Sequence, residues 1–154
     1  MESNSGRSAF PIVTVGGLLQ GTAGDVLLVR THKWSGKWGI PGGKVEYGES
    51  LVTAFVREIR EETGLLAMTP RLMMIQDCVE HPEFHLPRHF VLINYLAKVE
   101  GRSPKVVLNE EASDYLWVSL TSSIAMDLNE PTRKLVEYVL KGGKEIWTPS
   151  ASAT

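Results

Sequence analysis

Hydrophobic residues along this chain recur with two different periods, and each period predicts one kind of element. Apolar runs bounded by Gly, Pro, Asn and Asp favour strands. The run at 71–80 is followed by a similar run at 89–100, and we expect these two to be antiparallel neighbours. Gly16 and Gly17 interrupt the apolar run at 10–20, which indicates a bulge or a close backbone approach. The predicted strands lie at 10–20, 25–31, 71–80, 89–100 and 114–120.

A helical period replaces the strand pattern after Ser50. The segment 51–63 holds no Gly or Pro, Ser50 is a good N-cap, and Gly64 suits the C-terminal end. An apolar stripe is expected on one face of this helix, formed by Leu51, Val52, Phe55, Val56 and Ile59. The pattern therefore predicts an amphipathic helix that packs on a core.

A second helix is predicted near the C-terminus. Asn129 is a suitable N-cap, Pro131 stands early, and Gly142 follows the end. Its buried face is expected to hold Leu135, Val136, Val139 and Leu140. Strands combined with two helices give an α/β (α+β) fold in which helices sandwich a mixed sheet.

Length and composition indicate one domain. We expect residues 10–147 to form it, with flexible tails at 1–9 and 148–154. The net charge of −2 and the pI of about 6.1 give no basic field for nucleic acid or a membrane surface. The N-terminus lacks the pattern of a signal peptide, and no apolar run approaches membrane-spanning length. With a single cysteine, Cys78, expected to be buried, the composition favours a cytoplasmic protein.

Candidate chemistry lies on the first helix. Glu58, Glu61 and Glu62 stand at i, i+3 and i+4, so their side chains share one face beside the apolar stripe. Like charges at this spacing repel, and the helix dipole disfavours them near the C-terminus. A divalent cation would relieve both effects, and carboxylate oxygens without Cys or His suit Mg²⁺ or Mn²⁺. The alternative is a solvated acidic face paired with Arg57 and Arg60.

A glycine pair precedes this helix. Pro41, Gly42 and Gly43 predict a tight segment whose backbone can approach another group and present carbonyl oxygens to a metal. An ordinary turn between two short strands is the alternative. The position directly before the acidic helix favours a site.

Together these residues match a motif, G-x5-E-x7-R-E-U-x-E-E-x-G-U, where U is a bulky aliphatic residue. The matching positions are Gly43, Glu49, Arg57, Glu58, Ile59, Glu61, Glu62, Gly64 and Leu65. The chain thereby resembles the Nudix (MutT-like) hydrolases, over about residues 10–142. The resemblance implies a helix–sheet–helix sandwich and water attack on a phosphorus of a nucleoside diphosphate linked to another group, with Mg²⁺ or Mn²⁺ as cofactor.

The same resemblance implies roles for the motif residues. Glu58 and Glu62 are expected metal ligands, and Glu61 is expected to be a ligand or the general base. Gly43, or Gly42 beside it, would offer a carbonyl to metal. Arg57 would orient a glutamate.

Two further site residues are expected outside the motif. Arg30 ends the run DVLLVR, and related proteins often have a basic side chain that contacts phosphate at this place. The alternative is that Arg30 is only a solvated residue at the end of a strand. Relatives also often supply a metal-binding or catalytic carboxylate from the loop that contains Glu110 and Glu111, and spacing favours Glu111. For substrate binding the candidates are Tyr47, Phe84, His85 and Arg88, with Trp34 and His89 also considered.

The sequence leaves the substrate open. A small-molecule nucleotide is expected, with either a nucleoside triphosphate pyrophosphatase or an enzyme for nucleotide sugars or ADP-ribose-like diphosphates as the activity. A non-catalytic Nudix-fold nucleotide sensor is the alternative. A homodimer is common among such proteins.

Overall fold

A computed structural model describes residues 9–146. The predicted tail at 148–154, residues 1–8 of the other predicted tail and residue 147 of the predicted domain lie outside the described residues. The strands are β1 (Ile12–Gln20), β2 (Asp25–Arg30), β3 (Trp38–Gly39), β4 (Gly42–Lys44), β5 (Met68–Val79), β6 (His89–Lys98) and β7 (Asp114–Ser119). The helices are α1 (Leu51–Thr63), α2 (Leu120–Ser123) and α3 (Glu130–Leu140), with a 3-10 turn at His32–Trp34. All five predicted strands and both long helices are present.

The sheet is mixed and has the order β3-β2-β1-β6-β5, with β4 paired to β1 and β7 paired to β2. β1 and β6 run parallel along their whole lengths, from Ile12 against Phe90 to Gln20 against Lys98. β5 and β6 are antiparallel neighbours, as the sequence predicts. The glycine pair 42–43 lies in β4, where it pairs with β1 at Val15 and Gly16.

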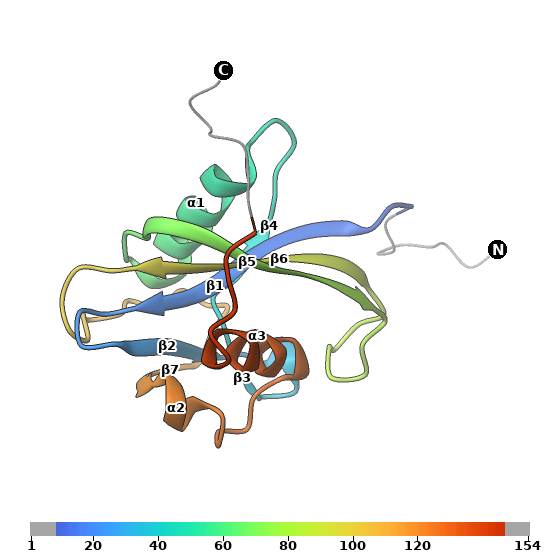
Figure 1. Ribbon diagram of the computed structural model, residues 1–154. Coiled ribbons are helices and arrows are strands. Elements are labelled where there is room, and N and C mark those ends of the chain that lie inside the picture. The colour runs from blue at the N-terminus through green and yellow to red at the C-terminus, as the bar shows by residue number, and fades with distance from the viewer. Residues whose placement is uncertain (1–8, 147–154) are drawn as a thin grey trace.

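Two hydrophobic cores cover the two faces of the sheet. One packs α1 against the sheet and includes Phe55, whose ring stacks on Tyr95 at a centroid distance of 4.7 Å. The other packs α3 through Leu135 and Val136. Figure 1 shows α1 on one side of the sheet and α3 on the other. The predicted α+β sandwich is therefore confirmed.

Gly17 explains the glycine pair in β1. A Cβ at this position would overlap the Tyr95 carbonyl oxygen and lie 3.0 Å from the Phe55 ring. The absent side chain therefore lets α1 pack closely on the centre of the sheet, which confirms the predicted close backbone approach.

The ends of α1 agree with the sequence, whereas its apolar stripe differs at the first turn. Ser50 accepts a hydrogen bond from the Thr53 amide, and Gly64 adopts the left-handed conformation. Leu51 and Val52 are exposed, contrary to expectation, and burial concentrates further along at Ala54, Phe55, Ile59, Glu62 and Thr63. Because the C-terminal half of α1 is the buried half, Glu62 is carried into the protein interior.

The C-terminal part shows two smaller differences. Asn129 caps α3, and Leu135 and Val136 are buried, but Leu140 is 39% exposed because it stands in the last turn. The short α2 begins at Leu120, which the sequence pattern had assigned to the end of a strand. Cys78 is buried as expected. Within residues 9–146, none of the helices has the length and apolar character needed to cross a membrane.

Candidate active site

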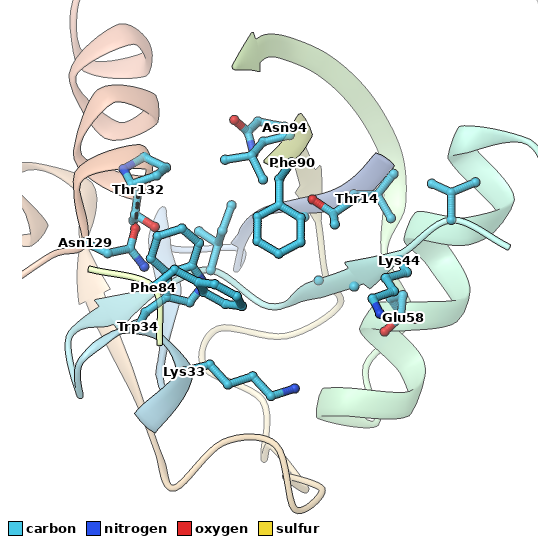
Figure 2. Close-up of a pocket in the computed structure, with 18 of the residues that line it drawn as sticks. Thr14, Lys33, Trp34, Lys44, Glu58, Phe84, Phe90, Asn94, Asn129 and Thr132 are labelled. Atoms are coloured by element: carbon cyan, nitrogen blue, oxygen red, sulfur yellow. Dashed lines mark hydrogen bonds between the residues drawn. The ribbon is translucent and has the colours of Figure 1, made fainter. Parts of the chain in front are cut away.

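A cavity of about 600 Å³ lies between the α3 face of the sheet and the β4–α1 segment. Figure 2 shows Glu58 and Lys44 on one side of it, Asn129 and Thr132 on the other, and Asn94 next to Phe90 between the two sides. The rings of Trp34, Phe84 and Phe90 lie between. The remaining lining residues are Thr14, Val15, Gly16, Lys33, Ile40, Gly42, Gly43, Val45, Glu46, Leu92, Glu111 and Pro131.

Two glutamates of α1 are drawn inward and one is not. Glu62 is 8% exposed, and its Oε2 accepts a hydrogen bond of 2.9 Å from the Gly42 amide. The Glu58 side chain is 13% exposed and lines the cavity. Burial raises the pKa of Glu58, because the charged form loses solvation. Glu61 is 57% exposed and does not line the cavity.

Glu111, from the loop before β7, forms a hydrogen bond with Glu62 of α1. Burial, a hydrogen bond with Glu111 and the negative charges of Glu111 and Glu58 together raise the pKa of Glu62 to about 9. That hydrogen bond, together with Lys33, lowers the pKa of Glu111. Of these two carboxyl groups, Glu62 is thus the one that favours the protonated form. Glu110, the other candidate in the same loop, is exposed and lines no part of the cavity.

Arg57 organises the carboxylates that surround it. Its Nε and Nη2 donate to the two oxygens of Glu49, and its Nη1 donates to Glu58 at 2.8 Å and to Glu61 at 3.2 Å. Its Nη2 also donates to the Lys44 carbonyl oxygen at 3.1 Å. The hydrogen bonds with Glu49 and Glu58 raise the pKa of Arg57, and the hydrogen bonds from Arg57 lower the pKa of Glu49. The guanidinium thus fixes β4 relative to α1.

The glycine pair brings backbone to the carboxylates. A Cβ on Gly43 would overlap the Glu58 carboxylate, and a Cβ on Gly42 would overlap the Val15 carbonyl oxygen. Both positions line the cavity. Residues with side chains would push β4 away from both α1 and β1.

The donor set fits a hard divalent cation. Glu58, Glu62 and Glu111 supply carboxylate oxygens, with backbone from Gly43 beside them, and such oxygen-only sets suit Mg²⁺ or Mn²⁺. Within residues 9–146, no three His, Cys, Asp or Glu side chains converge closely enough to hold one ion. In the structure Arg57 engages Glu58, while Glu62 and Glu111 engage each other. A cation would replace the contact between Glu62 and Glu111, whereas Arg57 engages one oxygen of Glu58 and leaves the other available.

Of the residues considered for substrate binding, Phe84 and Trp34 line the cavity, whereas Arg30, Tyr47, His85 and Arg88 do not. Arg30 points elsewhere, because it pairs with Asp114 at 2.8 Å and stacks over the Trp38 ring. Tyr47 is fully exposed and is absent from the lining.

The other two predicted residues lie in the loop between β5 and β6. His85 contacts the edges of the Phe84 and His32 rings but does not line the cavity itself. Arg88 lines a separate hollow of about 290 Å³ beside Phe10.

Lys33 and Asn94 are among the polar lining residues that the sequence analysis missed. Lys33 lies in the 3-10 turn, with its Nζ 3.7 Å from Glu111. Its position in a polar loop gave no distinguishing signal. Asn94 is 4% exposed in the middle of β6. The signal for Asn94 was available, because it is the one polar residue within the apolar run FVLINYLA.

Comparisons with known proteins agree with this geometry. The family model described as NUDIX domain matches residues 11–139. The nucleoside triphosphatase NudI of Escherichia coli K12 is 35% identical over 113 residues, which is 70% of this chain and 77% of that protein.

Two solved structures are similar in both fold and sequence. A MutT NUDIX hydrolase from Burkholderia pseudomallei has a TM-score of 0.71 and 28% identity, over 84% of this chain and 98% of that one. A MutT protein from Methanosarcina mazei Go1 has a TM-score of 0.68 and 30% identity, over 88% and 97% of the two chains. This chain therefore belongs to the Nudix family and is a hydrolase that acts on phosphoric anhydrides.

Proposed function

We propose that this protein hydrolyses nucleoside triphosphates to a nucleoside monophosphate and pyrophosphate, with Mg²⁺ or Mn²⁺ as cofactor. The observation that carries the proposal is the polarity of the cavity, which has carboxylates at one end and aromatic rings at the other. Phosphates bridged by a cation suit the first end, and a base suits the second. The similarity to a nucleoside triphosphatase favours this substrate class over nucleotide sugars.

The aromatic end has the geometry of a stacking site. The centroids of Trp34 and Phe84 are 4.9 Å apart, as are those of Phe84 and Phe90. The loop that carries Phe84 is held to the 3-10 turn, because the His85 amide donates to the Lys33 carbonyl oxygen at 2.8 Å. A planar base would therefore pack against the cavity side of this preformed ring cluster, and the loop need not be ordered first.

The carboxylate end supplies the groups that hold the cation. Glu58, Glu62 and Glu111 are the proposed ligands, with a backbone oxygen of Gly43 as a further donor. A bound divalent cation would neutralise phosphate charge and lower the pKa of a bound water. Glu61 remains the candidate for taking the proton from that water, from its place beside Arg57 at 3.2 Å. Arg57 keeps Glu58 in position.

Lys33 is the proposed phosphate-contacting cation, in the role that the sequence suggested for Arg30. It lines the cavity beside Glu111, whereas the guanidinium of Arg30 is committed to Asp114 and Trp38. When metal holds Glu111, the Lys33 ammonium is free to pair with a phosphate oxygen instead.

A substrate panel tests this proposal. Nucleoside triphosphates, ADP-ribose and nucleotide sugars would be incubated with millimolar Mg²⁺, with the Glu62→Gln variant as control. Pyrophosphate release from triphosphates, lost with EDTA, is the expected result. Two monophosphates from ADP-ribose or a nucleotide sugar would assign the enzyme to those diphosphates instead. Tight nucleotide binding with turnover no faster than the control would favour a sensor.

A further inference from the structure

Asn94 is a buried amide whose orientation is fixed by its neighbours. The Gln76 Nε2 donates to the Pro131 carbonyl oxygen at 2.9 Å and to the Asn94 Oδ1 at 2.8 Å. A backbone carbonyl can only accept, so the Gln76 atom that faces it must be the NH₂ group. That NH₂ group in turn requires an acceptor on Asn94. The Asn94 oxygen is therefore directed at Gln76.

The amide nitrogen of Asn94 is consequently left facing the cavity. Asn94 lines the cavity, is 4% exposed, and has no hydrogen-bond partner for Nδ2 among residues 9–146. Every fully buried side-chain nitrogen or oxygen within residues 9–146 has a hydrogen-bond partner. Because the Asn94 Nδ2 has none, it is not fully buried and is accessible from the cavity. A buried donor without a partner is costly, whereas a ligand acceptor would satisfy it.

The second amide at this end has the same polarity. Asn129 is 5% exposed, and its Oδ1 is occupied by the Thr132 amide at 2.9 Å as the cap of α3. Both amide oxygens are thus used within the protein. Each amide oxygen is directed at a donor within the protein, so the part of the cavity that Asn94 and Asn129 line presents their NH₂ groups, which have no hydrogen-bond partner within residues 9–146.

We propose that Asn94, held by Gln76, selects bases that carry an exocyclic carbonyl oxygen over bases that carry an amino group at that position. This rests on the proposed function, since it assigns the base end of the same cavity. Guanine, thymine and uracil present such an oxygen, whereas adenine and cytosine present an NH₂ group. An NH₂ group opposite Asn94 would leave two donors facing each other without an acceptor.

Matched nucleotide pairs isolate the exchanged group. ITP and ATP differ mainly in the oxygen or amino group of a purine, and UTP and CTP differ in the same way for a pyrimidine. Dissociation constants would be measured by calorimetry with the Glu62→Gln variant, because this variant is expected not to hydrolyse the nucleotide. The ratio kcat/KM would be measured with the wild type. We expect the oxo member to be favoured by about tenfold or more in the pair whose ring size fits the cavity.

Variants test the orientation argument. Asn94→Leu removes the donor and should bring the ratio within each pair close to one. Asn94→Asp presents an acceptor and should reverse the preference. Gln76→Met touches no ligand but frees the Asn94 amide to rotate, so it should also relax the preference. Gln20→Met is the matched control, because it removes a similar half-buried amide bond, to the Gly24 carbonyl oxygen, outside the cavity; its ratio should equal that of the wild type.

The outcomes separate this inference from the proposed function. Nucleotide binding or turnover with equal preference for oxo and amino bases overturns the inference alone. A wild-type preference that persists in Asn94→Leu and Gln76→Met also overturns it. Absence of any nucleotide binding overturns both. If Asn94→Asp fails to fold, Asn94→Leu and Gln76→Met still decide the question.

Discussion

Gly43 lies against Glu58 so closely that a single added methyl group would overlap the carboxylate. We predict that Gly43→Ala displaces Glu58 and raises the Mg²⁺ concentration needed for half-maximal activity by about tenfold or more. The check is a double-mutant cycle with Glu58→Ala. If the glycine serves Glu58, the alanine at position 43 costs little once that carboxylate is absent. Equal costs in both backgrounds would contradict this relationship.

Glu62 should be essential for turnover and dispensable for folding. Glu62→Gln keeps an oxygen that can accept from the Gly42 amide but removes the charge that binds a cation. We predict that kcat falls at least ~10²-fold while the melting temperature changes by only a few degrees. Steady-state kinetics and thermal unfolding measure the two quantities. Full activity of this variant would refute the proposed site.

Stability without metal should fall as pH rises. Because the pKa of Glu62 is raised to about 9 in the folded state, folding favours the protonated carboxyl group. This contribution is complete below the unfolded pKa, about 4.3, and is lost as pH rises towards 9. In EDTA, the free energy of unfolding should decline by up to about 1.4 kcal/mol per pH unit across this window.

Glu62→Gln is the control for this pH dependence. Its free energy of unfolding should fall less steeply with pH, because the glutamine side chain cannot ionise. Denaturant titrations from pH 5 to 9 give the slopes. Identical slopes for the variant and the wild type would show that another group dominates.

Arg57 should act through position rather than charge alone. Arg57→Lys keeps the charge but cannot make the paired hydrogen bonds to Glu49 together with that to Glu58. We expect a loss of about 1–3 kcal/mol in the free energy of unfolding and weaker activation by Mg²⁺. Arg60→Lys, at an exposed position on the same helix, is the matched control. Equal effects of the two changes would argue against a positioning role.

Lys33 and Arg30 form a matched pair of cations for testing phosphate contact. Lys33 lines the cavity, whereas Arg30 is paired with Asp114 outside it. Lys33→Met should raise KM for a nucleoside triphosphate by about tenfold, the loss of one charge-assisted hydrogen bond. Arg30→Met should change KM less than about twofold. The reverse order would restore the role that the sequence suggested for Arg30.

The local elements could be predicted from the sequence because their signals are local. Ser50 and Gly64 mark the ends of α1 by capping chemistry, and the spacing of Glu58, Glu61 and Glu62 places them on one helical face at any position in a fold. The motif identified the family for the same reason, since its positions are close in the chain.

Tertiary structure alone decided which polar groups meet. Sequence spacing could not distinguish the buried Glu62 from the exposed Glu61, because their exposure depends on the angle at which α1 packs on the sheet. Sequence spacing also could not show that Arg30 pairs with Asp114 of β7. Nor could it show that Lys33, and not Arg30, lies at the cavity beside Glu111. The direction of the Asn94 amide is set by Gln76 and by Pro131, which stands 37 positions further along the chain. Such long-range contacts leave no periodic trace in one sequence, whereas caps, helical faces and motifs do.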